Sequence, residues 1–200
     1  MLTAPVICVP YDSKIKTIDD LVTEFKARPG EVKVASAGVG AGGHLAAETF
    51  RKATGIEYRH IPYKGGYPAV LSTVKGETEV VRQLSMEATH MLRAKKLRAL
   101  ANMSTQALDI DGYGEVPPVM QFIPDHAPLQ YLFGLYIPKA TPQEAVETIN
   151  KAFDAAAASD SIKRLAKEKA SAVVNYKGEE ALKLSETTGN NVNCILQEIG

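Results

Sequence analysis

The stretch Ser36-Ala37-Gly38-Val39-Gly40-Ala41-Gly42-Gly43-His44-Leu45 decides how this chain is interpreted. The β-branched segment 32–35 precedes it and predicts a strand, while helix-forming residues follow it. Glycine permits positive φ and close backbone approach, and the first turn of a helix leaves N–H groups unpaired at a partly positive end. Four glycines in the six residues 38–43 exceed what a tight structural turn needs, so the pattern predicts a site for a carboxylate or phosphate.

The composition is ordinary for a soluble globular protein, and no apolar run approaches the ~20 residues of a membrane span. The 200 residues are enough for one or two domains with a real core. Lys plus Arg and Asp plus Glu both number 23, so the basic excess typical of nucleic-acid binders is missing. Residues 1–5 lack the pattern of a secretory signal, which predicts a cytoplasmic location if the chain is expressed as written. Cys8 and Cys194, near opposite ends, are expected to be unrelated thiols.

Residues 1–103 alternate between strand and helix patterns. Strands are expected at 5–10, 32–35, 57–61, 78–81 and 97–101, and helices at 18–28, 45–54, 69–75 and 86–95. Such alternation predicts a parallel sheet with helices on both faces, in which ligands bind at the carboxyl ends of the strands.

The remainder of the chain loses this alternation. After the loop signals of 104–130 we expect a buried strand at 131–138 and a long helix opened by Thr141-Pro142. A short helix at 159–170, a strand at 172–175 and a final helix from Gly178 follow.

A second glycine-bearing loop, 62–68, is expected at the same edge of the sheet as the first. Arg82 should face this edge too, because it follows strand 78–81, and a cation there would suit a carboxylate. Purely structural alternatives stay open for the side chains. Tyr63 could pack the loop, Lys64 could be solvated, Arg82 could be an exposed rim residue and His44 could bond to nearby backbone. The predicted ligand-binding set is Ser36, Gly38, Gly40, Ala41, Gly42, Gly43, His44, Tyr63, Lys64, Gly65, Gly66 and Arg82.

Two other functional classes were weighed on the same residues. Gly38-x-Gly40-x-x-Gly43 matches the dinucleotide fingerprint, yet the next strand ends Ile61-Pro62-Tyr63 without the acid that a ribose requires. For an enzyme, no Gly-x-Ser-x-Gly elbow is present, and neither His44 nor His60 has a spaced metal-ligand partner. We therefore predict no catalytic residues, no metal and no cofactor, and keep a Rossmann-like nucleotide-binding protein as the alternative.

Several segments, in order, resemble one known family. They are Val34–Leu45 with its Ser-x-Gly-x-Gly-x-x-x-His-Leu pattern, Ile61–Gly66, Leu97–Ala101, and Phe133-Gly134 leading to Pro138 and Thr141-Pro142. Together they resemble the substrate-binding protein of tripartite tricarboxylate transporters, the Bug or TctC-like family. The resemblance implies a type II periplasmic-binding-protein fold, a non-catalytic role, and a small di- or tricarboxylate held largely by backbone N–H groups. It also implies a periplasmic location and membrane permease partners.

The sequence departs from that family in three respects. Members have about a hundred further residues before Pro5, whereas here residues 10–128 would form domain two, and 1–9 with 129–200 the hinge strands and a partial domain one. The family's Pro-Thr-x-x-Glu motif appears as Pro117-Pro118-Val119-Met120-Gln121, and a usual acid is replaced by Gln83. A partial domain would leave exposed strand edges, which predicts a homodimer, or else a degenerate remnant that binds nothing.

Overall fold

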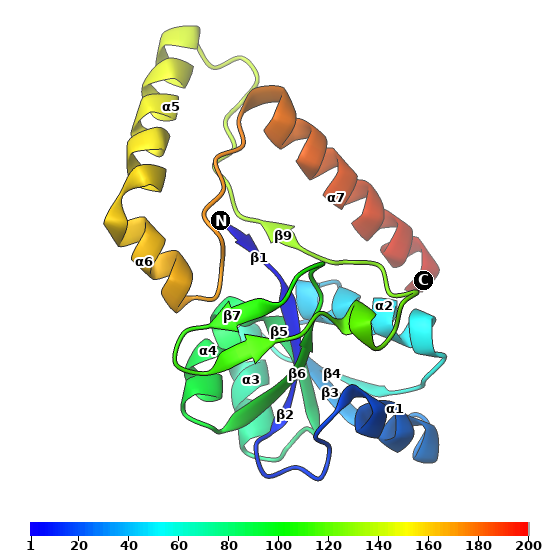
Figure 1. The fold of residues 1–200 in the computed structure, drawn as a ribbon. Helices are drawn as coiled ribbons and strands as arrows, with labels where there is room; N and C mark the ends of the chain where they lie inside the picture. The colour runs from blue at the N-terminus through cyan, green and yellow to red at the C-terminus, as the bar shows by residue number, and fades with distance from the viewer. Residues whose placement is uncertain (200) are drawn as a thin grey trace.

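The computed structural model describes residues 1–199, apart from the side chains at positions 191, 194, 198 and 199 (Figure 1). Its centre is a five-stranded sheet in the order β4-β3-β5-β2-β6. The strands are β2 (Pro5–Pro10), β3 (Lys33–Ser36), β4 (Arg59–Pro62), β5 (Val80–Leu84) and β6 (Leu97–Asn102). The alternating strand and helix pattern therefore predicted the elements of this sheet to within a few residues.

Helices cover both faces of the sheet, as the alternation predicted. One core cluster joins the sheet to α1 (Ile18–Ala27) and α2 (Gly42–Thr54), with Phe25 and Phe50 fully buried. The other joins it to α3 (Gly66–Val74) and α4 (Ser85–Arg93). Helix α1 begins with a capping box, in which the Thr17 side chain accepts from the Asp20 N–H and the Asp20 side chain accepts from the Thr17 N–H.

The prediction of a wholly parallel sheet is wrong at one strand. Strands β3, β4 and β5 pair in parallel, but β2 runs antiparallel to both β5 and β6. The chain enters β2 at the carboxyl edge of the other strands, where the Ser85 N–H donates to the Ala4 carbonyl at 3.0 Å. The alternation of strands and helices in the sequence does not determine whether the first strand, β2, runs parallel or antiparallel to its neighbours.

The domain boundary expected at residue 10 cuts through β2. Residues Val6–Val9 are fully buried and lie between β5 and β6 in the sheet. A hinge role for segment 1–9 stays a prediction. Within β2, Cys8 is a free thiol whose pKa is raised by burial. The Cys194 side chain lies outside the described residues. The wider division into two domains stays a prediction.

The remaining elements form a second, more open region (Figure 1). A β7–β8 hairpin and a short 3-10 turn η1 link it to the sheet, and β1 pairs antiparallel with β9. Helices α5 and α6 stand away from the sheet, while α7 runs from that region back to α2. The bounds are β1 (Leu2–Thr3), β7 (Leu108–Ile110), β8 (Gly114–Val116), η1 (Val119–Gln121), β9 (Tyr131–Leu132), α5 (Gln143–Ala158), α6 (Asp160–Glu168) and α7 (Gly178–Ile199).

Two predicted strands of this region are much shorter than expected. Of segment 131–138 only β9 is a strand, and of segment 172–175 only Ala172 forms a bridge, with Leu2. Phe133 continues the pairing by exchanging backbone hydrogen bonds with Met1, whereas residues 134–137 are exposed and have no neighbouring strand among the described residues. A strand needs a partner for its backbone groups, which explains why the apolar pattern alone produced no sheet there.

Candidate functional site

The start of α2 carries backbone N–H groups that the described part of the chain leaves unpaired. Ala41 is the N-cap and makes no side-chain cap bond, and the first turn contains no acidic residue. The N–H groups of Gly42, Gly43 and His44 have no hydrogen-bond partner among the described residues. Three unpaired donors at the positive end of a 13-residue helix suit a carboxylate.

The rest of the predicted cradle is occupied by the protein itself. The Gly38 N–H donates to Ser36 Oγ (3.3 Å), the Gly40 N–H to His44 Nδ1 (3.1 Å) and the Ala41 N–H to the Gly38 carbonyl (3.3 Å). The prediction that the N–H groups from Gly40 onward hold the ligand is therefore too broad. The N–H groups of Gly40 and Ala41 already donate to other groups of the loop. Only the three at the first turn of α2 stay unpaired.

Two glycines allow other elements to approach α2 closely. A Cβ on Gly43 would overlap the Arg82 carbonyl oxygen, so only glycine lets the helix lie this near β5. A Cβ on Gly42 would lie 3.0 Å from the Tyr131 ring, and the Tyr131 hydroxyl donates to the Gly42 carbonyl at 3.3 Å. The start of α2 is thus fixed between β5 and the segment containing β9.

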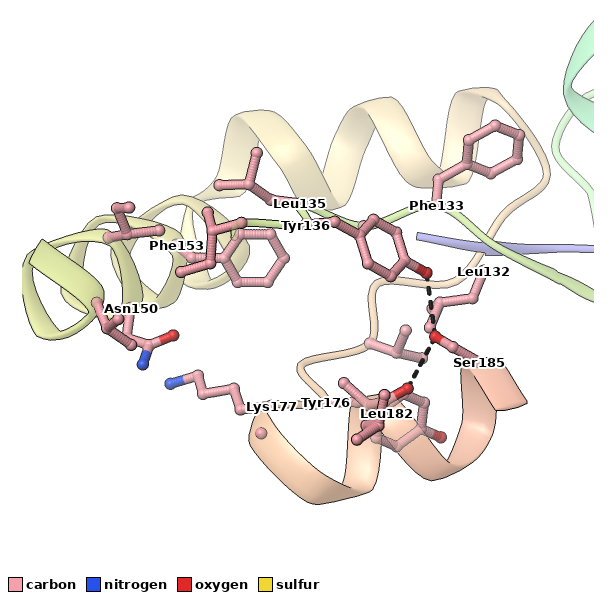
Figure 2. Close-up of a pocket in the computed structure, with 17 residues that line it drawn as sticks. Leu132, Phe133, Leu135, Tyr136, Asn150, Phe153, Tyr176, Lys177, Leu182 and Ser185 are labelled. Carbon is pink, nitrogen blue, oxygen red and sulfur yellow. Dashed lines mark hydrogen bonds between the residues drawn. The ribbon is translucent and has the colours of Figure 1, made fainter. Parts of the chain in front are cut away.

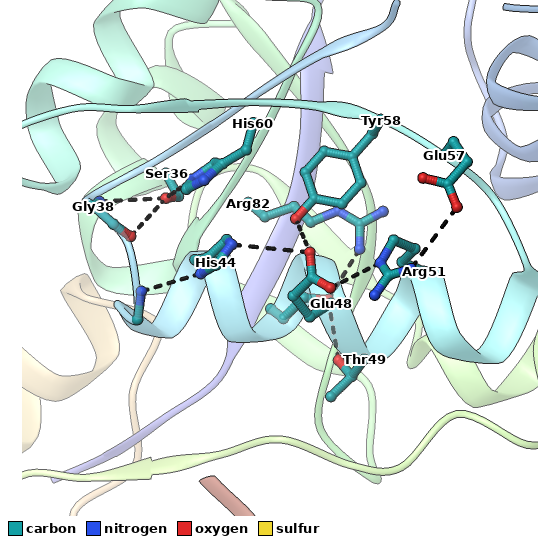
Figure 3. A network of polar contacts seen from close by, with 12 residues as sticks. Ser36, Gly38, His44, Glu48, Thr49, Arg51, Glu57, Tyr58, His60 and Arg82 are labelled. Atoms are coloured by element: carbon teal, nitrogen blue, oxygen red, sulfur yellow. Dashed lines mark hydrogen bonds and ion pairs between the residues drawn. The ribbon is translucent and has the colours of Figure 1, made fainter. Parts of the chain in front are cut away.

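A buried polar network supports the loop from behind (Figure 3). Ser36 Oγ lies 2.7 Å from His60 Nε2, and the rings of His44 and His60 stack with centroids 4.1 Å apart. Burial lowers the pKa of His44 and lowers that of His60 to about 4, so both rings are neutral at pH 7. Neutral His44 can then accept the Gly40 N–H, which holds the loop closed. Ser36 and His44 therefore act on the loop's shape.

Glu48 closes this network on the far side of His44 (Figure 3). It accepts from the Tyr58 hydroxyl and from Arg51 Nε at 2.8 Å, and lies 3.9 Å from His44 Nε2. Burial alone would raise the pKa of Glu48, but the bonds from Tyr58 and Arg51 outweigh it and lower that pKa. The carboxylate is thus ionised and fully engaged in structure.

The second glycine-bearing loop is tied to the first. The Tyr63 N–H donates to the Ser36 carbonyl at 2.9 Å, and the Gly65 N–H to the Ala37 carbonyl at 3.2 Å. The Tyr63 hydroxyl points to Glu77, at 3.5 Å, and Lys64 is exposed. Gly66 begins α3, and the carboxyl group of Glu87 lies against it. The structure therefore brings the two predicted loops together, as expected for neighbouring strand ends.

The expected position of Arg82 is wrong. Its side chain is 1% exposed and lies beneath α2, with the guanidinium 4.0 Å from the centroid of the Phe50 ring and Nη1 donating to the Ala46 carbonyl at 3.0 Å. Burial lowers its pKa to about 9. Strand alternation turns residue 82 toward the α1–α2 face rather than to the edge. Gln83, the next residue, and Glu87 lie at that edge instead, and neither was in the predicted set.

An apolar cavity lies in the second region, away from the glycine loops (Figure 2). Its volume is about 330 Å³, and segment 132–137, α5 and α7 form its walls. Large side chains are exposed there, Leu135 at 64% and Tyr136 at 70%. A surface of this kind is typical of a face that another polypeptide covers.

The described residues show neither a metal-binding cluster nor a membrane-spanning helix. They contain no group of three or more His, Cys, Asp or Glu arranged to hold a metal ion. None of the described helices combines the length and the hydropathy that a membrane span requires.

Comparison with known proteins places these features in context. Residues 1–200 match the family described as "Tripartite tricarboxylate transporter family receptor", TctC. A curated relative from Pseudomonas sp. strain P51, the UPF0065 protein in the tcbD-tcbE intergenic region, is 30% identical over 162 residues, which cover 78% of this chain and 46% of that protein. The chain thus spans about half the length of the curated relatives it matches.

Solved structures agree with the fold. A periplasmic transporter structure aligns with 98% of this chain and 65% of its own, at 28% identity and a TM-score of 0.87. R. palustris Rpa4515, solved with adipate, aligns with 98% of this chain and 64% of its own, at 21% identity and a TM-score of 0.82.

Proposed function

Because the chain belongs to the tripartite tricarboxylate transporter receptor family, TctC, we propose that it binds a small organic carboxylate at the start of α2. The observation that carries this proposal is the set of three unpaired N–H groups on Gly42, Gly43 and His44, at a helix end with no cap and no acid of its own. A guest carboxylate would complete the hydrogen bonding that the helix lacks. The adipate-bound relative supports the ligand class.

Membership of the same family supports a proposal for the role in the cell. The protein is a non-catalytic periplasmic receptor that delivers a di- or tricarboxylate to the membrane permease of a tripartite transporter. Ligand-induced closure around the glycine loops would signal occupancy to the permease.

A thermal-shift screen tests the ligand class. Succinate, glutarate, adipate and citrate should raise the melting temperature, whereas NAD and ATP should leave it unchanged, because ligands stabilise the state that they bind. A shift with a nucleotide and none with any carboxylate would favour the Rossmann-like alternative. No shift with either class would identify a remnant that binds nothing.

A matched pair of variants locates the site. Gly42→Val should abolish the carboxylate shift, because its side chain would enter the space between α2 and Tyr131. Gly189→Ala is the control, since a Cβ there meets nothing within 4 Å. Calorimetric titration of both folded variants with adipate should show binding only in the control. Equal binding in both would place the ligand elsewhere.

We also propose that two copies associate through the apolar cavity. Segment 134–137 has no strand partner among the described residues, and no residue of α5 is buried. Unpaired backbone and exposed apolar side chains favour association. Sedimentation velocity at micromolar concentration should show a dimer, which Leu135→Glu should dissociate. A compact monomer under the same conditions would contradict this.

A further inference from the structure

The His44 ring ties the first glycine loop to the buried polar network through a single nitrogen atom (Figure 3). Its Nδ1 accepts a hydrogen bond from the Gly40 N–H at 3.1 Å. In a neutral imidazole one nitrogen accepts and the other carries the proton, so the proton of His44 lies on Nε2, which is 3.9 Å from Glu48 Oε1. A second proton can enter only at Nδ1, and it must break the bond to Gly40.

Two neighbours of His44 determine where the network takes up its first proton. On α2 the Glu48 carboxylate favours a charged His44 ring, while burial, the larger effect, lowers the pKa of that ring from 6.5. From β4 the His60 ring stacks on His44, with centroids 4.1 Å apart. Burial, and next the charge of His44, lower the pKa of His60 to about 4. Because one charged ring disfavours the other at this distance, the first proton enters the ring beside Glu48.

The other titratable side chains packed around the start of α2 are engaged in bonds of their own. The apolar Leu196 is the described contact of α7 with Gly40. The engaged side chains are Arg51 and Tyr58, which bond to Glu48, Arg82, which donates to the Ala46 carbonyl, Glu87, which accepts from Gln83, and Tyr131, which donates to the Gly42 carbonyl. Their bonds leave His44 as the group whose protonation acts directly on the loop.

We propose that the hydrogen bond from Gly40 to His44 is a proton-dependent latch, which holds loop 38–41 closed while the ring is neutral and opens when Nδ1 takes up a proton. Opening frees the Gly40 N–H and places a positive charge beside the start of α2. The latch belongs to the free chain, and its effect on a ligand rests on the function proposed above. The freed donor and the positive charge both favour a carboxylate, so binding is coupled to proton uptake and tightens as the pH falls.

Nuclear magnetic resonance of the free chain tests the latch without any ligand. Between pH 7.5 and 5.0 the ring nitrogens of His44 and the amide of Gly40 should shift together, with one midpoint below pH 6.5. The Gly40 shift should be lost in His44→Gln, which has no titrating ring, and should persist in the control His60→Gln. Glu48→Gln should lower the midpoint by about one pH unit, because it removes the charge that favours the protonated ring.

Two results would overturn the latch. One is a Gly40 amide whose shift does not follow the His44 ring in the native chain, a measurement that requires no variant to fold. The other is a Gly40 shift that persists in His44→Gln and is lost in His60→Gln, because the proton would then be on His60.

Calorimetric titration with adipate at pH 7.5 and 5.5 tests the coupling to binding. The native chain and His44→Gln meet the same ionic form of adipate at each pH, so the comparison isolates the histidine. As the pH falls, the affinity of the native chain should rise at least about threefold relative to that of His44→Gln. The same pH dependence in both chains would overturn the coupling. Failure of the native chain to bind adipate at either pH would count against the proposed function, while the resonance data still decide the latch.

Discussion

His126 should make the stability of the fold depend on pH. The side chain is 2% exposed, its Nε2 lies 3.3 Å from Thr49 Oγ1, and its Nδ1 is buried without a partner among the described residues. Burial, and next the charge of Arg82, lower the pKa of His126 from 6.5 to about 4. His126 is therefore protonated below about pH 6.5 in the unfolded chain, but only below about pH 4 in the folded chain.

The sign and size of the effect follow from linkage. A depressed histidine pKa gives stability that is complete above pH 6.5 and is lost as the pH falls toward 4. Between pH 7.5 and 5.0 the loss from this one side chain is about 2 kcal/mol. His44 and His60 have lowered pKa values as well, so the whole protein should lose more than this.

Urea unfolding followed by circular dichroism at both pH values measures the effect. His126→Gln keeps a polar side chain but does not titrate, so its stability should fall by about 2 kcal/mol less than that of the native chain. Comparing differences removes the cost of the substitution itself. His90→Gln, at an exposed histidine, is the matched control. An equal fall in the native chain and in His126→Gln would refute the argument.

Three further substitutions test the packing around the site. Gly43→Ala should destabilise the fold by about 3 kcal/mol or more in urea unfolding, because its Cβ would overlap the Arg82 carbonyl. The control Gly189→Ala should not destabilise the fold. Equal stability of the two variants would show that α2 can shift freely. Arg82→Met should lower the stability of the fold by less than about 1 kcal/mol or increase it, because an apolar side chain of similar length replaces a buried guanidinium with an unpaired Nε. A large loss of stability would show that the contact between Arg82 and Phe50 dominates. Thr17→Ala should cost about 1 kcal/mol through the lost α1 cap, as measured by melting temperature, and no change would mean that the cap is redundant.

Local signals in the sequence predicted much of the fold. Thr17 and the glycines at 38–43 are turn and cap signals that act over a few residues, and both helices begin where those signals placed them within three residues. The strand patterns likewise gave the sheet's five members. These features depend on short-range sterics and capping, which are written in adjacent residues.

Long-range contacts explain what the sequence did not reveal. The sequence pattern ended the strand at residue 81, but β5 continues to Leu84, so Arg82 lies within the strand and alternation turns it under α2. The direction of β2 is set by its pairing with the distant strands β5 and β6. Gln83 and Glu87 join the start of α2 to that of α3, residues some twenty or more positions away. The sequence offered Gln83 only as the replacement of a usual acid, and Arg82 was chosen instead because it follows the predicted strand 78–81.

Helix α7 joins the apolar cavity to the glycine loop before α2. Its first turns carry Ala181, Leu182 and Ser185 on the cavity wall, and near its other end Leu196 lies 3.8 Å from the position of a Cβ on Gly40. At 22 residues it is a rod of about 33 Å. Because tilting such a rod at one end displaces the other, we expect a partner that moves the first turns of α7 to shift Leu196 against the glycine loop. Any resulting coupling between a partner on the cavity and a carboxylate at α2 must be reciprocal, so each would change the affinity of the other by the same factor.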